Sequence, residues 1–150
     1  MKQLFIFGLG TLIFVACNKD KFETKPQLKV ESLNYDIVPK GAPLRVTFSF
    51  TDKEGDVDDS IYVVRTRLNQ RGLYTDPKAF GYKIPAFPDQ PEGEITLNMT
   101  YANDLTFGLS PVDIPGSNNK ELDTLVLKFV AIDKKENVSD TATANVIVER

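Results

Sequence analysis

The sequence predicts an all-β domain, an antiparallel β-sandwich of about seven strands. Three observations support this fold class. Short runs in which apolar and polar residues alternate recur along the chain, and Pro, Gly and Asp punctuate the segments between them. Val, Ile, Thr and aromatic residues dominate these runs, as is typical of strands. No long window shows the 3.6-residue period of an amphipathic helix.

The clearest element is a strand, an acidic turn and a second strand between Pro43 and Val64. Over residues 44–51, Leu, Val and Phe alternate with Arg, Thr and Ser, so one face is apolar and the other polar. Residues 51–60 hold five carboxylates, and a strand resumes at Ile61. In this second strand we expect one row of side chains to face inward (Tyr62, Val64, Thr66, Leu68) and the other to face outward (Ile61, Val63, Arg65, Arg67).

The remaining strands follow the same alternation. The first, from Leu28 to Ile37, changes parity near Ser32, which predicts a bulge or a strand shared between two sheets. A short strand is expected near Phe80–Ile84, and further strands at Glu94–Tyr101, Asp123–Asp133 and Thr141–Glu149, with a long loop over 102–122. Short alternating strands without helices favour an immunoglobulin-like (cadherin- or fibronectin-III-like) sandwich, and a jelly roll or small barrel is the alternative.

The N-terminus is typical of an export signal. An apolar run from Leu4 to Val15 follows Lys2 and is too short to span a bilayer as a helix. It ends at Cys17, the single cysteine of the chain. The junction resembles a bacterial lipobox, in which the cysteine is acylated, with chains such as palmitate; an ordinary signal peptide with a chance cysteine is the alternative. The predicted division is a lipoprotein signal peptide (1–16), a lipidated tether (17–27) and a β-sandwich domain (28–150).

The residues after the cysteine carry an expectation for location. Asn18-Lys-Asp20 is similar to the signal that sends lipoproteins of Bacteroidota to the outer face of the outer membrane, although Lys21 replaces the usual second acid. The resemblance implies a protein of the cell envelope, anchored at the outer membrane. Its first partner is then the membrane itself, through the lipid on Cys17.

Two segments of the domain resemble known β-sandwich repeats. The strand that ends Ala131-Ile-Asp133, followed by the Ser- and Thr-rich strand 139–148, is similar to the last two strands of cadherin-type repeats, and Asp52-Lys-Glu54-Gly is similar to their acidic turn. The single immunoglobulin-like domains of Bacteroidota lipoproteins carry a turn like the one in residues 48–56. Because the acidic motif of cadherins in the 95–101 region and their Asp/Asn linker are absent, the resemblance does not imply a calcium-filled junction between repeats.

The strand order indicates a possible metal site. If consecutive strands are neighbours, the acidic turn, the 85–93 connection and the 134–139 turn all lie at the end where the tether enters. Four carboxylates then come close together: Asp52, Glu54, Asp56 and Asp133. Clustered carboxylates supply the oxygen ligands that calcium prefers, although the spacing is not that of an EF-hand. The alternative is a solvated turn neutralised by Lys134 and Lys135.

Two surfaces are candidate partner sites. One is the end opposite the tether, where loops 39–43, 69–79 and 102–122 gather and Tyr74 and Phe107 serve as aromatic anchors; alternatively, Phe107 only caps the core. The other is the outer face of the sheet that contains the strands starting at Ile61 and Asp123. Its expected apolar and basic residues include Val63, Arg65 and Val130. Alternatively, the aromatic segment 72–87 folds over that face.

Composition excludes several function classes. The chain has no His, and its only thiol is at the predicted acylation site, so it cannot build Ser-His, Cys-His or His-zinc centres. With a net charge of −3 and scattered Lys and Arg, it has no basic footprint for nucleic acid. We therefore expect a non-catalytic module that binds an envelope protein or assists a surface complex. The alternatives are a glycan-binding accessory module of a nutrient-uptake system, disfavoured by the lack of Trp, and a purely structural lipoprotein.

Overall fold

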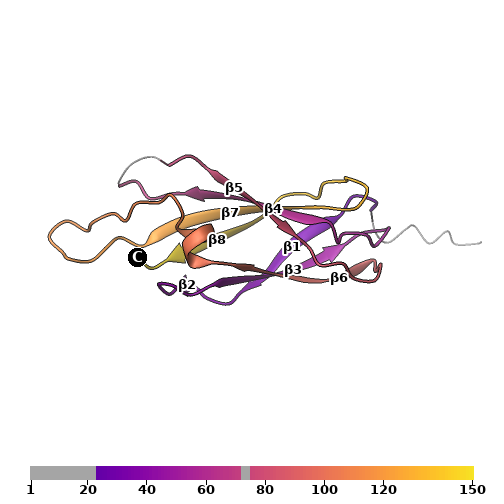
Figure 1. Ribbon diagram of the computed structural model, residues 1–150, viewed down its shortest axis with the longest axis horizontal. Coiled ribbons are helices and arrows are strands. Elements are labelled where there is room, and N and C mark those ends of the chain that lie inside the picture. Colours follow the sequence, from indigo (N-terminus) through magenta and orange to yellow (C-terminus); the bar gives the residue numbers. More distant parts are fainter. Residues whose placement is uncertain (1–22, 72–74) are drawn as a thin grey trace, which may run out of the picture.

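Two β-sheets pack face to face in the computed structural model, which describes residues 23–71 and 75–150 (Figure 1). The elements are β1 (Gln27–Leu33), β2 (Ile37–Val38), β3 (Leu44–Thr51), β4 (Ser60–Arg67), β5 (Lys78–Lys83), β6 (Glu92–Met99), the π-helical turn η1 (Tyr101–Leu105), β7 (Asp123–Ile132) and β8 (Ala142–Val148). One sheet has the order β1-β3-β6 and the other the order β2-β8-β7-β4-β5. The predicted all-β, two-layered architecture is confirmed.

The core lies between the sheets and follows the alternation of the strands. In β3 the apolar row is buried while the intervening polar residues are partly or fully exposed. In β6, Ile95, Leu97 and Met99 face inward as the alternation predicts. Phe48 of the three-stranded sheet meets Phe129 of the five-stranded sheet in a T-shaped contact, with ring centroids 4.9 Å apart. Aromatic and aliphatic side chains from both layers therefore hold the sheets together.

The first strand is divided between the two sheets. In β1 the register against β3 shifts between Val30 and Ser32, which is the bulge that the parity change predicts. After the bulge the chain crosses to the other layer, where β2 pairs with β8. The two predicted possibilities, a bulge and a shared strand, thus occur together. The pairing of β2 with β8 is parallel, and all other strand pairs are antiparallel.

The orientation predicted for β4 is wrong. Ile61 and Val63 are buried in the core, and Arg65 is also buried, at 2% exposure. Tyr62 and Val64, expected inside, are exposed. Both rows of this strand begin with apolar residues, so alternation alone does not choose between them. Because Val63 and Arg65 lie inside, neither contributes to the outer face of the sheet.

The aromatic segment also departs from expectation. Residues 78–83 form β5, close to the predicted short strand, and β5 pairs with β4 as the edge of the five-stranded sheet. The described part of the segment, residues 75–87, therefore extends the sheet sideways through β5 and does not fold over its outer face. Val130 of β7 is partly exposed on that face, as expected. Phe87, after β5, packs against Phe50 with ring centroids 5.7 Å apart.

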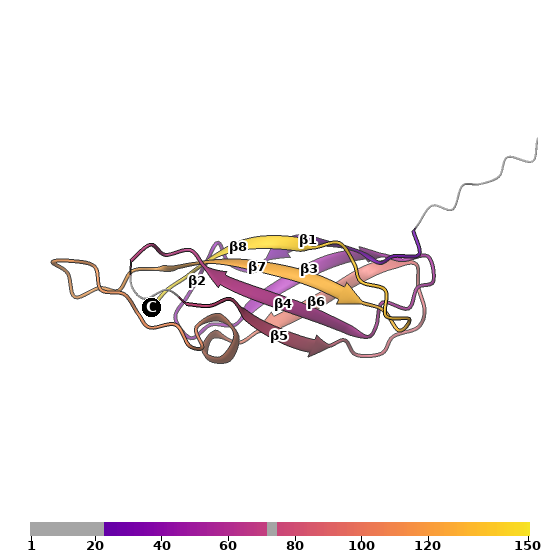
Figure 2. The ribbon, with the colours of Figure 1, turned by 90° about the horizontal axis from the view of Figure 1, so that it is seen from above.

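The sandwich has two distinct ends, which Figure 2 shows at opposite extremes of the long axis. The acidic loop 52–59, the 84–91 connection and the 133–141 turn lie at the end where β1 begins, because Gln27 pairs with Thr51. Lys25 is held there by an ion pair with Asp140. Loops 39–43 and 100–122, residues 68–71 and 75–77, and the C-terminus lie at the other end, as predicted.

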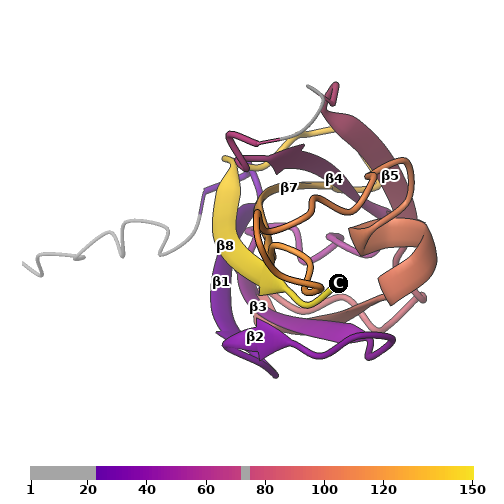
Figure 3. The same ribbon diagram turned by 90° about the vertical axis from the view of Figure 1, so that its left-hand side faces the viewer.

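The loop after β6 contains a short helical element that the sequence did not predict. Tyr101, expected to continue the strand inward, starts η1 instead. Figure 3, a view along the long axis, shows η1 beside the mouth of the sandwich. Leu105 and Leu109 are buried and close the core at this end. Throughout residues 23–71 and 75–150, no helix has the length and apolar character needed to cross a membrane.

Candidate functional site

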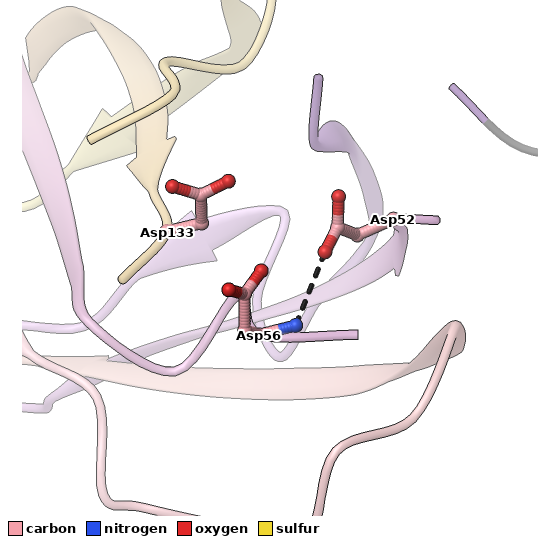
Figure 4. A group of neighbouring side chains, drawn as sticks. All are labelled: Asp52, Asp56 and Asp133. Atoms are coloured by element: carbon pink, nitrogen blue, oxygen red, sulfur yellow. Dashed lines mark hydrogen bonds between the residues drawn. The ribbon is translucent and has the colours of Figure 1, made fainter. Parts of the chain in front are cut away.

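Three buried carboxylates meet at the end of the sandwich where β1 begins. One oxygen from each of Asp52, Asp56 and Asp133 lies within 4.8 Å of the others. Figure 4 shows the three side chains converging from the acidic loop and from the end of β7. All three are nearly inaccessible, with 0%, 8% and 1% exposure. The predicted meeting of Asp133 with the acidic turn is confirmed for Asp52 and Asp56, whereas Glu54 lies outside the group.

The acidic loop is held in place by backbone hydrogen bonds to its neighbours. Asp52 N donates to Pro91 O at 2.9 Å, and Gln90 N donates to Gly55 O at 3.1 Å. Gly55 has a φ of 76°, and a Cβ there would lie 2.7–2.9 Å from the backbone of Gln90. Glycine is therefore required on both conformational and steric grounds. The side chain of Val57, fully buried, anchors the loop to the core.

Asp133 organises the turn that follows β7. Its Oδ1 accepts hydrogen bonds from the backbone N–H groups of Lys135 and Asn137, both at 2.8 Å, and its Oδ2 accepts one from Asn137 Nδ2 at 2.7 Å. Lys134 N donates to Asp56 O at 3.1 Å, which ties this turn to the acidic loop. Much of the acceptor capacity of Asp133 is therefore already used by its own turn.

The other two carboxylates keep free oxygens. Asp52 Oδ2 accepts a hydrogen bond from Asp56 N at 3.1 Å, but Asp52 Oδ1 and Asp56 Oδ1 are buried without a hydrogen-bond partner in the described part of the chain. Burial raises the pKa of Asp52, the backbone N–H groups of Asp56 and Gly55 lower it, and the Asp56 carboxylate raises it further, so the net direction is upward. Lys135 lies at ion-pair distance, with its Nζ 3.6 Å from Asp56 Oδ2 and 4.0 Å from Glu54 Oε1.

A fourth acid, Asp58, is neutralised separately. Lys134 Nζ lies 2.8 Å from Asp58 Oδ1, and Phe87 N donates to Asp58 Oδ2 at 3.3 Å. Although burial alone favours the neutral carboxyl, the hydrogen bond from Lys134 and the one from Phe87 N hold the pKa of Asp58 below its ordinary value. The predicted neutralisation by lysine is thus correct for Asp58. For the Asp52–Asp56–Asp133 group, the lysine at ion-pair distance is Lys135, which is exposed and lies 3.6 Å from Asp56.

The group has the donor chemistry of a calcium site. Asp52 Oδ1 and Asp56 Oδ1 have no hydrogen-bond partner in the described part of the chain, and one oxygen of Asp133 belongs to the same group. Calcium takes six to eight oxygens, so one oxygen from each of the three aspartates would supply at most half of them, and backbone carbonyls or water would have to supply the rest. Zinc is a poorer match because the group offers neither His nor thiolate ligands.

A second buried charge cluster lies at the opposite end and was not predicted. Asp123, fully buried, contacts Arg67 Nη2 at 2.5 Å and Arg150 Nε at 3.1 Å. Arg65 donates from Nη1 to Asp104 O and from Nη2 to Phe107 O, both at 2.7 Å. Arginines at alternate positions of one strand are the signal that could have indicated this cluster, because they share a face with Val63.

A pocket of about 380 Å³ opens beside this cluster. Arg65 and Arg67 belong to its walls, with Lys78 and Phe107 at the exposed side. Phe107 is 53% exposed, so it does not cap the core, and its ring lies 5.4 Å from Lys78 Nζ. The other predicted anchor, Tyr74, and the predicted lipidation site, Cys17, lie outside the described residues.

Comparisons with known proteins identify no family: no family model and no curated protein matches the chain. Among solved structures, the chain is similar to a β-glucosidase from Kluyveromyces marxianus in complex with glucose, with 8% identity and a TM-score of 0.46 over 85% of this chain and 14% of that one. The chain is also similar to the sporulation control protein Spo0M from Bacillus subtilis, with 12% identity and a TM-score of 0.44 over 84% of this chain and 50% of that one. A Niemann-Pick type C2 protein from the Japanese carpenter ant matches with 11% identity and a TM-score of 0.40 over 85% of this chain and 98% of that one. The chain spans half or less of the length of the first two, and similarities this weak assign neither a family nor a function.

Proposed function

We propose that this protein is a non-catalytic, lipid-anchored module of the cell envelope that binds a partner protein through the loop end of an immunoglobulin-like sandwich. The observation that carries the proposal is that the end where the chain enters the domain and the end where the long loops gather lie on opposite sides of the sandwich. The chain enters the domain beside the acidic loop, and the long loops gather at the far end, next to the 380 Å³ pocket. With an anchor at Cys17, the loop end points away from the membrane, where a partner can reach it.

The strand order supports the finer, immunoglobulin-like assignment. Immunoglobulin domains place their first, second and fifth strands, A, B and E, in one sheet and C, F and G in the other. Here β1, β3 and β6 form one sheet, and β4, β7 and β8 form the centre of the other, with β5 at the position of the additional strand C′. The crossing of the first strand to β8 also fits this arrangement.

Calcium is proposed as the resident ion of the acidic end. Two fully or nearly buried carboxylate oxygens without partners, on Asp52 and Asp56, are costly unless a cation satisfies them. A calcium ion there joins the acidic loop to the turn after β7. In that role it stabilises the membrane-proximal end and leaves the loop end free for recognition.

The test is cross-linking followed by affinity capture from native membranes, with the full-length protein as bait. We expect a specific envelope protein to be captured, and Phe107→Ala to reduce its recovery severalfold. Val138→Ala is the matched control, since Val138 is also exposed, at 46%, but lies in the turn at the acidic end. Recovery that depends on Val138 and not on Phe107 contradicts the assignment of the loop end. Intact mass of protein from its native host tests acylation of Cys17 independently.

The same bait protein distinguishes protein binding from the alternative function, that of a glycan-binding accessory module. Glycan recognition predicts capture of carbohydrate on an array with no envelope protein in the cross-linked material. If the protein is a purely structural lipoprotein, it should capture neither a carbohydrate nor an envelope protein.

A further inference from the structure

The pocket at the loop end concentrates positive charge on a protein with a net charge of −3. Arg65, Arg67 and Lys78 belong to its walls, against a single carboxylate, Asp76, among the described residues that line it. Arg65 and Lys78 are directly paired across β4 and β5, so both side chains lie on the same side of the sheet. Like charges in directly opposed positions repel each other, and an anion between them removes that repulsion.

In the described part of the chain, the charge of Arg65 is balanced by backbone carbonyls and the ring of Phe80 and by no ion pair. Its guanidinium is buried and donates to two backbone carbonyls, and within residues 23–71 and 75–150 no carboxylate comes within ion-pair distance of it. Burial lowers its pKa, whereas the more distant Asp123 raises it. Asp123 is itself shared between Arg67 and Arg150. Arg65 lines the pocket with a buried side chain, and water screens a charge in such a place less than on an open surface.

At the entrance of the pocket, the cation of Lys78 lies beside the exposed ring of Phe107. Lys78 Nζ lies 5.4 Å from the centroid of Phe107, and the face of the ring that it covers is not free for stacking. Aromatic residues and arginine are enriched among the residues that contribute most of the binding energy in protein interfaces, and this pocket brings both kinds together. A sugar ring, in contrast, needs an open aromatic face.

From this arrangement we infer that the pocket binds an acidic peptide segment of the partner protein, with an Asp or Glu carboxylate between Lys78 and Arg65. The inference rests on the proposed function and names the chemistry that the loop end recognises. An acidic side chain placed there pairs with the Lys78 ammonium at the mouth, and the apolar part of the peptide contacts Phe107. Because this attraction is electrostatic and partly exposed, binding weakens as salt increases.

The test is fluorescence anisotropy of a labelled Gly-Glu-Asp-Glu-Gly peptide with the full-length protein, with Gly-Gln-Asn-Gln-Gly as the neutral peptide. We expect binding of the acidic peptide only, weakened about tenfold by Lys78→Glu and lowered between about 50 and 300 mM salt. Lys128→Glu is the control, because it makes the same charge change on the exposed outer face of β7. Unchanged thermal melting of both variants shows that the fold is retained.

Three outcomes overturn the inference: no binding of the acidic peptide at millimolar concentration, equal binding of the neutral peptide, or equal weakening by Lys78→Glu and Lys128→Glu. Trigalacturonate and inorganic phosphate are the competing probes. If trigalacturonate binds in a Lys78-dependent manner and the peptide does not, the pocket recognises an acidic glycan. A negative peptide result with Phe107-dependent capture of an envelope protein leaves the proposed function standing and removes only the acidic ligand.

Discussion

Arg67 and Asp123 form an ion pair of 2.5 Å at the loop end, with side-chain exposures of only 5% and 0%. Arg150, the last residue of the chain, approaches the other oxygen of Asp123 at 3.1 Å. The end of β4, the start of β7 and the residues after β8 are therefore joined by one carboxylate. Arg67 adds hydrogen bonds to Asn69 and Ser110, so the same cluster also positions the loop that forms the pocket.

Asp123→Ala should destabilise the domain strongly, because it leaves Arg67 and Arg150 buried without a counter-charge. We expect a loss of about 3–5 kcal/mol in the free energy of unfolding, measured by urea denaturation. The exposed pair of Lys83 and Asp59 is the control, and Lys83→Gln should cost at most about 1 kcal/mol. A loss in Asp123→Ala as small as in the control contradicts a structural role for the buried cluster.

Val63 and Val130 distinguish the inner and outer faces of the five-stranded sheet. Val63 is fully buried, and Val130 is partly exposed. Val63→Lys places an ammonium group in the core and should unfold the domain or cost more than about 4 kcal/mol. Val130→Lys should change stability by less than about 1 kcal/mol, since the lysine extends into solvent. Circular dichroism and urea midpoints measure both, and similar losses in the two variants contradict the orientation of β4.

This contrast shows how far alternation predicts the fold. In β3 and β6 one row is apolar and the other polar, so alternation predicts the inward row within both strands, although it extends β6 two residues too far, to Tyr101. In β4 the rows are ambiguous, and the one that is buried ends in Arg65 and Arg67. Those arginines are tolerated inside because the carbonyls of Asp104 and Phe107 and the carboxylate of Asp123 satisfy them. These partners come from segments far along the chain with no periodic pattern of their own.

The acidic end was easier to predict than the loop end for a related reason. Which loops share an end depends only on the order and direction of strands, and that order placed Asp133 beside the acidic turn. The absence of Glu54 from the group depends on the local path of the loop, which the positive φ of Gly55 and its contacts with Gln90 determine. Such backbone detail has no counterpart in alternation.

Gly55 and Gly41 test that local path. Both have positive φ values, 76° and 80°, but only Gly55 is crowded, since nothing lies within 4 Å of a Cβ at Gly41. Gly41→Ala should cost about 1–2 kcal/mol from backbone strain alone. Gly55→Ala adds a clash with the Gln90 backbone and should cost at least about 1 kcal/mol more. Equal losses in urea denaturation contradict the close approach of the two loops.

Asp52→Asn tests the metal site through its dependence on calcium and pH. Millimolar calcium should raise the melting temperature of the native protein by several degrees, because a ligand that binds only the folded state stabilises it. The variant should lose this increase, since a neutral amide replaces a ligand carboxylate. In chelator at neutral pH the variant should melt at the same or a higher temperature, because it removes a buried charge that lies beside Asp56.

The pH dependence follows from the raised pKa of Asp52. The folded state binds the proton of the Asp52 carboxyl group more tightly than the unfolded state does. Protonation of Asp52 therefore stabilises the fold fully below the unfolded pKa of about 4, and this stabilisation is lost as pH rises through the folded pKa. In chelator, the native protein should therefore gain stability on mild acidification relative to Asp52→Asn.

Asp59→Asn, an exposed change in the same loop, is the control and should keep the calcium response. If calcium does not raise the melting temperature of the native protein, or raises that of Asp52→Asn equally, the carboxylate group is not a calcium site.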